Sequence, residues 1–255
     1  MVFSAISAIS VLNVFSAFSQ PLPRTDRNSQ IAHEQLVEKA RQGGIDVYFE
    51  GDSITRRWGT SDAAYREFLD NWRRNFFGWN AANFGWGADT VQNILWRLTN
   101  GELDGVHPKA IVLLAGTNNL RAQGRGGVDE KTVDEVAGGI RAILDVMRQK
   151  APAATIILTG ITPRRDREMW PTIDAINTQL ASLADGRRVR YININARLTG
   201  ADGTLVDGVT VDGLHLSVTG YQIWADALKP IFTEILGPPA ATDHAPPPTG
   251  DPAAK

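Results

Sequence analysis

The sequence predicts an α/β fold in which helices cover both faces of a five-stranded parallel sheet. Strand-like and helix-like segments alternate between residues 29 and 236, as parallel strands joined by helical crossovers require. The run at 110–115 is continuously apolar, which is typical of a strand buried on both faces. With 43% hydrophobic and 21% charged residues among 255, the chain has an ordinary globular balance and suffices for one sizeable domain.

The first half of the chain predicts three helices and two strands. A helix is expected over 30–42, because Gly43-Gly44 follows it and would end it. A β-rich strand is expected at 46–50 and a weaker one at 80–84. The other two helices are expected at 62–72 and 90–98, the second with an apolar face made by Val91, Ile94, Leu95 and Leu98.

The second half continues the alternation. After the apolar strand at 110–115, apolar residues recur at spacings of three and four from Val133 to Met147 and predict an amphipathic helix. Strands are then expected at 154–158 and 189–194, separated by a helix from Ile173 to Leu183. A last helix is expected over 218–235.

Both ends of the chain differ in composition from this domain, which we place at residues 29–236. Residues 1–28 form an N-terminal extension, and its first 19 residues are uncharged and apolar but diluted by five serines. They resemble a weak secretory signal, so a secreted or periplasmic location is expected, with a cytoplasmic location as the alternative. Residues 237–255 are rich in Pro, Ala and Gly and are expected to be disordered.

Charge and cysteine content exclude several classes of function. A net charge of −2 gives no reason to expect a nucleic-acid partner, and no segment predicts stable membrane insertion. The absence of cysteine excludes disulfides, thiolate metal sites and cysteine nucleophiles. The oligomeric state is left open.

Chemistry is expected in the loops that follow the strands, because ligands bind at the carboxyl edge of such a sheet. After the first strand, Gly51-Asp52-Ser53 would expose a serine hydroxyl at a strand-to-helix turn, although these residues also favour a purely structural helix cap. After the third, Asn118 would offer an amide to a developing oxyanion, with an ordinary turn as an equal alternative.

A carboxylate and an imidazole lie three residues apart near the end of the domain, in Asp212-Gly213-Leu214-His215. Asp212 would fix the tautomer of His215 and stabilise its protonated form. His215 alone is expected at the active edge; the other histidines lie on a helix, before a strand and in the tail: His33, His107 and His244. Together with Ser53 and Asn118, this pair completes the set of groups that acyl transfer needs.

Three separated blocks of residues resemble the SGNH, or GDSL-like, hydrolase superfamily. Gly51-Asp52-Ser53 matches its first block, with Ile54 in place of leucine; residues 116–119 match the third and 212–215 the fifth. Residues 83–103 and 135–144 are similar to the catalytic subunits of platelet-activating-factor acetylhydrolase, and the whole resemblance covers about residues 45–235.

The resemblance implies a three-layer α/β/α, flavodoxin-like fold and ester hydrolysis without cofactor or metal. It implies Ser53 as nucleophile, His215 as base and Asp212 as its partner, with the Ser53 N–H and the Asn118 side chain in an oxyanion hole. The second block has glycine where this chain has Ala88, so Ala88 is expected to give the third donor, with Gly87 as second choice. Ala88 serves as well as glycine provided its φ is negative, and its methyl group would favour small acyl groups.

We therefore expect a serine esterase that acts on short, acetyl-type esters of small molecules or carbohydrates. The alternatives are a lysophospholipase, thioesterase or aryl esterase for longer acyl chains, and a binding module without catalysis. Trp86 and Trp170 are candidates for the pocket wall, although packing is favoured for most tryptophans. The basic run at 164–167 is placed to contact an anionic substrate, but we favour a solvated loop.

Overall fold

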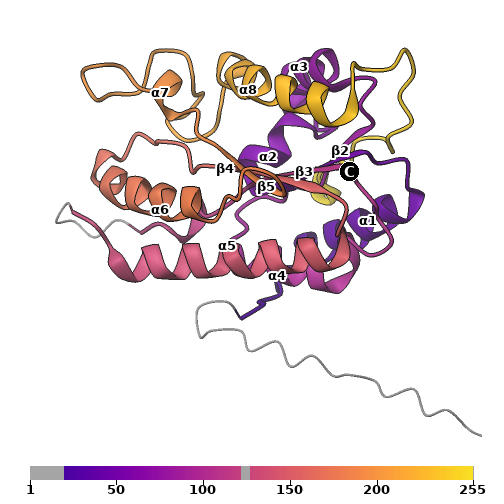
Figure 1. Cartoon of the computed structure of the whole chain (residues 1–255), viewed down its shortest axis with the longest axis horizontal. Coiled ribbons are helices and arrows are strands. Elements are labelled where there is room, and N and C mark those ends of the chain that lie inside the picture. Colours follow the sequence, from indigo (N-terminus) through magenta and orange to yellow (C-terminus); the bar gives the residue numbers. More distant parts are fainter. Residues whose placement is uncertain (1–19, 122–126, 255) are drawn as a thin grey trace, which may run out of the picture.

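The five strands form one fully parallel sheet, so the predicted α/β class is confirmed (Figure 1). The computed structural model describes residues 20–121 and 127–254. In spatial order the strands are β2 (Ala81–Asn83), β1 (Val47–Gly51), β3 (Ala110–Leu114), β4 (Thr155–Thr159) and β5 (Val189–Ile192). Because every strand runs in the same direction, the loops after all five meet at one edge.

Helices cover both faces of this sheet, which makes the expected three layers (Figure 1). Alternate strand residues face opposite helical layers: Tyr48 packs with the first layer, and Val47 and Phe49 pack with the second. The first layer consists of α1 (Arg27–Gln42), α4 (Val91–Arg97), α5 (Glu130–Lys150) and α6 (Trp170–Ser182). The second consists of α2 (Ser53–Trp58), α3 (Arg66–Phe76), α7 (Asn195–Leu198) and α8 (Val218–Leu236).

The helix expected over 62–72 differs most from its prediction. A 3-10 turn at Ala63–Tyr65 precedes α3, which begins at Arg66 and continues to Phe76. The short helices α2 and α7 have no predicted bounds, because six and four residues are too few to establish a helical apolar period.

The C-terminal segment, which the sequence predicts to be disordered, is ordered in the structure. Residues 237–254 are not a free tail but lie along the domain. The Ala240 N–H donates to the Gly78 carbonyl at 2.9 Å, and the Gly78 N–H donates to the Asp243 carboxylate at 2.7 Å. Prolines 246–248 line a cavity of about 230 Å³ with Trp72 and Phe76. Backbone hydrogen bonds and proline packing hold a segment whose composition lacks core-forming residues.

The signal-like segment, residues 1–19, lies outside the described residues. Directly after it, the Leu22 N–H donates to the Gln92 carbonyl at 3.1 Å, so the chain enters the domain beside α4. Within residues 20–121 and 127–254, no helix combines the length and apolar character needed to cross a bilayer.

Candidate active site

Ser53 is the first residue of α2, directly beyond the end of β1. The helix cap is Asp52, whose carboxylate accepts a hydrogen bond from the Ile54 N–H at 2.9 Å. Asp52, and not Ser53, is therefore the residue that caps the helix. The Ser53 hydroxyl is not used by the cap and can contact another group. Gly51 permits this tight turn, because a Cβ there would lie 2.4 Å from the Leu114 carbonyl oxygen.

The structure brings Ser53, His215 and Asp212 into one hydrogen-bonded chain. The Ser53 Oγ lies 2.9 Å from His215 Nε2, and His215 Nδ1 lies 2.7 Å from Asp212 Oδ2. Asp212 Oδ1 also accepts the backbone N–H groups of Leu214 and His215, at 3.0 and 2.8 Å. These bonds fold residues 212–215 into a closed turn, so the carboxylate and imidazole are held in place before any ligand binds.

The electrostatics of this chain suit a neutral imidazole beside an ionised carboxylate. Burial alone would raise the pKa of Asp212, but the hydrogen bonds from His215 and Leu214 lower it to about 2. The pKa of His215 is lowered from its usual value by burial and by the charges of Arg57 and Arg164, against the opposing effect of Asp212. At neutral pH His215 is therefore free to accept a proton from Ser53.

The expected oxyanion donors after β2 and β3 are joined by a hydrogen bond. Asn118 donates its side-chain amide to the Asp89 carbonyl at 2.9 Å, which ties it to the loop that carries Gly87 and Ala88. The Gly87 carbonyl accepts from Arg24 Nη1 at 2.9 Å. Since the C=O and N–H of a trans peptide point in opposite directions, Arg24 fixes the direction of the Ala88 N–H. Neither the Gly87 nor the Ala88 N–H donates to another described residue.

Ala88 does not have the negative φ expected of it. Its φ is +63°, in the left-handed region that glycine adopts without penalty. The expectation that Ala88 replaces glycine with a negative φ is therefore wrong. The N–H remains available, but alanine holds this conformation at a cost of about 1 kcal/mol.

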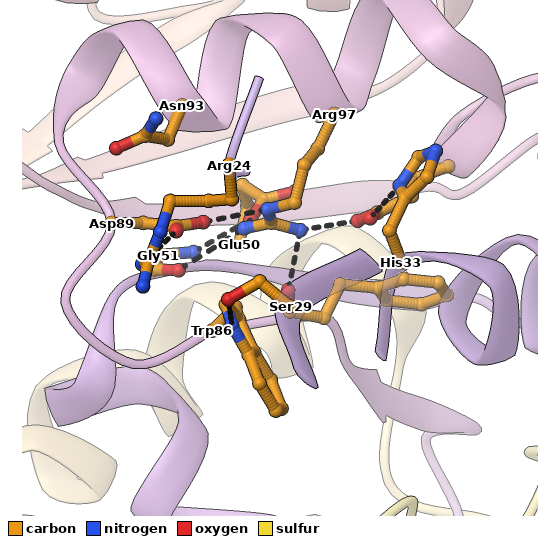
Figure 2. Close-up of polar contacts among 12 residues, drawn as sticks. Arg24, Ser29, His33, Glu50, Gly51, Trp86, Asp89, Asn93 and Arg97 are labelled. Atoms are coloured by element: carbon orange, nitrogen blue, oxygen red, sulfur yellow. Dashed lines mark hydrogen bonds and ion pairs between the residues drawn. The ribbon is translucent and has the colours of Figure 1, made fainter. Parts of the chain in front are cut away.

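A buried charge cluster, missed by sequence analysis, supports both loops (Figure 2). Arg97, on α4, is only 3% exposed and donates to Asp89 at 2.7 Å, to Glu50 at 2.6 Å and to Glu102. The Asp89 carboxylate also accepts a hydrogen bond from Arg24 Nη1 at 3.2 Å. Burial raises the pKa of Glu50 to about 8 and that of Asp89 to about 6, and the charge of Arg97 opposes both shifts.

This cluster links the strand end before Ser53 to the loop that contains Ala88. Glu50 directly precedes Gly51, and Asp89 directly follows Ala88. The sequence signal is weak: Glu50 ends an otherwise β-rich run, and Arg97 lies within the helix expected over 90–98 but is not part of its apolar face.

The remaining candidates divide between packing and the loop surface. Trp86 is 7% exposed and donates its indole N–H to the Ser29 hydroxyl at 2.8 Å, so it packs inside the domain. Trp170 and the basic run at 164–167 border a cavity beside the His215 loop. His33 contacts Glu102, and the His244 N–H donates to the Asn80 side chain. In the described part of the chain, no three His, Asp or Glu side chains group in a way that would hold a metal ion.

Comparisons with known proteins give the same assignment along most of the chain. The profile of the GDSL-like Lipase/Acylhydrolase family matches residues 49–223. Platelet-activating factor acetylhydrolase IB subunit alpha2 of Rattus norvegicus is 33% identical over 207 residues, which are 80% of this chain and 83% of that protein. The alpha1 subunit of Bos taurus is 30% identical over 209 residues, covering 80% and 82%.

Solved structures share the fold at lower identity. A GDSL-like lipase of Bacteroides thetaiotaomicron superposes with a TM-score of 0.59 at 20% identity, covering 80% of this chain and 98% of that one. A carbohydrate esterase family 3 protein of Talaromyces cellulolyticus gives 0.50 at 18% identity, covering 74% and 97%. With the matched family profile, the close relatives and the fold in agreement, the chain belongs to the GDSL-like lipase/acylhydrolase family and is a carboxylic ester hydrolase.

Proposed function

We propose that the protein hydrolyses short-chain, acetyl-type esters through a Ser53–His215–Asp212 triad and an acyl-enzyme intermediate. The observation that carries the proposal is the continuous chain of hydrogen bonds, 2.9 Å from Ser53 to His215 and 2.7 Å from His215 to Asp212. It joins a nucleophile, a base and the group that orients the base, in the geometry that acyl transfer requires.

The reaction follows from these positions. His215 removes the proton of the Ser53 hydroxyl as its oxygen attacks the ester carbonyl. The Ser53 and Ala88 N–H groups and the Asn118 amide stabilise the negative oxygen of the tetrahedral intermediate. His215 then protonates the departing alcohol, and the acyl group stays on Ser53. Water, deprotonated by His215, attacks that acyl-enzyme, releases the acid and restores the serine.

One observation favours short acyl chains. The named relatives are acetylhydrolases, and an acetyl group is the shortest common acyl group. Acetylated carbohydrates are therefore among the natural substrates to test, and lysophospholipids, thioesters and aryl esters of longer acids are the alternatives.

The test is hydrolysis of p-nitrophenyl esters from acetate to palmitate by wild type, Ser53→Ala and the control Ser182→Ala. Ser182 is the last residue of α6, and its hydroxyl donates to the nearby Gln179 carbonyl. We expect fastest cleavage of acetate or butyrate, loss of activity in Ser53→Ala alone, and fluorophosphonate labelling that requires Ser53. A wild type that cleaves no ester, or an active Ser53→Ala, would favour a binding module instead.

Asn118 offers a second test of the same mechanism. Removing one oxyanion donor lowers kcat by about 10²–10³ with little change in KM. Asn118→Ala is expected to show this loss with p-nitrophenyl acetate. An equal rise in KM with unchanged kcat would contradict a role in the transition state.

A further inference from the structure

A second binding feature lies beside the proposed triad. A cavity of about 360 Å³, open to the surface, lies between the segment after β4 and the loop that leads from α7 to His215. Gly213, between Asp212 and Leu214 in the triad loop, forms part of its wall. The charged and aromatic residues of the wall are Arg164, Arg165, Arg167, Trp170 and Asp207.

The arginines of this cavity are held in place by local contacts. The Arg165 N–H donates to the Gly213 carbonyl at 2.6 Å, and its side chain covers Gly213 so closely that an added Cβ would lie 2.7 Å from it. The Arg167 guanidinium lies 5.9 Å from the centre of the Trp170 ring. The Trp170 indole N–H donates to the Arg164 carbonyl at 2.6 Å, which closes the segment on itself.

The charge of the wall is positive. Arg164 forms an ion pair with Asp166 at 3.1 Å, yet its Nε is buried and has no hydrogen-bond partner among the described residues. Arg165 forms no ion pair within the described part of the chain, and Asp207 is the one carboxylate of the wall. Arg165 and Arg167 are exposed, as expected of a solvated loop, and together with Arg164 they line one pocket beside the His215 loop.

The order of the strands divides the active edge of the sheet into two sides. Ser53 and the proposed oxyanion donors follow the neighbouring strands β2, β1 and β3, whereas the cavity walls follow β4 and β5. His215 must protonate the departing alcohol, so the alcohol lies against the imidazole rather than in the oxyanion hole. The cavity adjoins the same loop as His215, and is therefore on the alcohol side of the scissile bond.

We propose that this cavity binds an anionic group, a carboxylate or a phosphate, carried by the alcohol part of the ester substrate. Arg165 and Arg167, which line the cavity, are the residues that select this group. Guanidinium groups match the oxygens of both anions with paired hydrogen bonds. This inference rests on the proposed esterase function and narrows its substrate class.

The test compares acetyl esters that differ only in charge: p-acetoxybenzoate, its neutral amide p-acetoxybenzamide, and p-acetoxyphenyl phosphate. The enzymes are wild type, Arg165→Gln/Arg167→Gln and the control Arg66→Gln/Arg187→Gln, which removes the same charge from exposed positions. The measured quantity is the ratio of kcat/KM for each anion to that for the amide. Dividing the ratio of each variant by that of wild type cancels the intrinsic reactivity of the esters.

We expect Arg165→Gln/Arg167→Gln to lower this ratio about tenfold, as loss of charge-assisted hydrogen bonds predicts. The ratio of the control variant should stay within about twofold of wild type. The anion with the larger loss identifies the preferred group. An unchanged ratio, or an equal loss in the control, would overturn the inference while leaving the esterase function intact. Failure of wild type to cleave any of the three would instead contradict the esterase function.

Discussion

At the scale of single residues, Ala88 is the point where this chain departs from its family pattern at a visible cost. The backbone there has a φ of +63°, which favours glycine, and the side chain is exposed. The departure is visible in the sequence, because the block that these residues resemble has glycine at this position. The sign of φ is not visible there, because it depends on how Arg24 and Asp89 hold the loop.

Ala88→Gly is expected to stabilise the protein. It relieves the left-handed strain and should raise the free energy of unfolding by about 0.5–1 kcal/mol in urea denaturation. Because the N–H remains, kcat for p-nitrophenyl acetate should be retained. The control Ala175→Gly lies inside α6 and should have the opposite sign, a loss of about 1 kcal/mol. Destabilisation by both substitutions would show that residue 88 is not strained.

The positive charge of Arg57 lowers the pKa of His215, the proposed base. Arg57 lies 3.4 Å from Asp212 Oδ2. Hydrolysis requires neutral His215, so kcat/KM should fall as the pH drops through the His215 pKa, which lies below the usual 6.5. Removing a nearby cation makes the protonated imidazole easier to form and raises that pKa.

Arg57→Gln should therefore move the acidic limb of the profile to higher pH. The measurement is kcat/KM against pH with a neutral ester, where the substrate itself does not titrate. Arg66→Gln removes an equal charge from an exposed position on α3 and should leave the midpoint in place. A midpoint that stays fixed, or moves to lower pH, in Arg57→Gln would contradict this role.

At the scale of elements, the strands and long helices were predictable because their apolar periods are local. Their supporting contacts were not, because Arg97 on α4 meets Glu50 on β1, which is 47 residues away along the chain. The triad was predictable for a different reason: Ser53 and the Asp212–His215 pair stand in short motifs whose residue types limit the possible chemistry. No such motif marks Arg97 or Arg24.

Arg97→Met should destabilise the protein by about 3–5 kcal/mol, because it removes the cation that contacts three fully buried carboxyl groups. Lysine is not expected to rescue it, since different nitrogens of the guanidinium reach Glu50, Asp89 and Glu102. Urea denaturation measures the loss. Arg148→Met, which breaks an exposed pair with Asp145, should cost less than about 1 kcal/mol. Equal effects of the two substitutions would show that the buried cluster is not a support.

At the scale of the whole molecule, the C-terminal segment is where composition misled the sequence analysis. Few apolar residues predict disorder when burial is the expected source of stability. Residues 237–254 are held differently, by hydrogen bonds such as Ala240 to Gly78 and Asn28 to Asp251, and by prolines beside Trp72. Whether a polar segment finds such partners depends on surfaces that only the folded domain creates.

Deleting residues 238–255 should therefore destabilise the domain while sparing its chemistry. Several backbone hydrogen bonds are lost and the aromatic wall at Trp72 and Phe76 is uncovered, so the free energy of unfolding should fall by about 1–3 kcal/mol. Among the described residues, the segment forms an ion pair with Arg56 and no hydrogen bond or ion pair with Ser53 or His215, so kcat/KM for p-nitrophenyl acetate should change less than about threefold.

A point substitution separates specific docking from a general effect of chain length. Asp243→Ala removes the acceptor of the Gly78 N–H and should reproduce part of the loss, whereas Glu38→Ala, on the exposed side of α1, should not. If the truncated protein unfolds at the same urea concentration as the full chain, the contacts of the segment carry no stability. If the truncated protein is stable but inactive, the segment instead supports the active edge. It would then act through its contact with Arg56, which lies on α2, the helix that begins with Ser53.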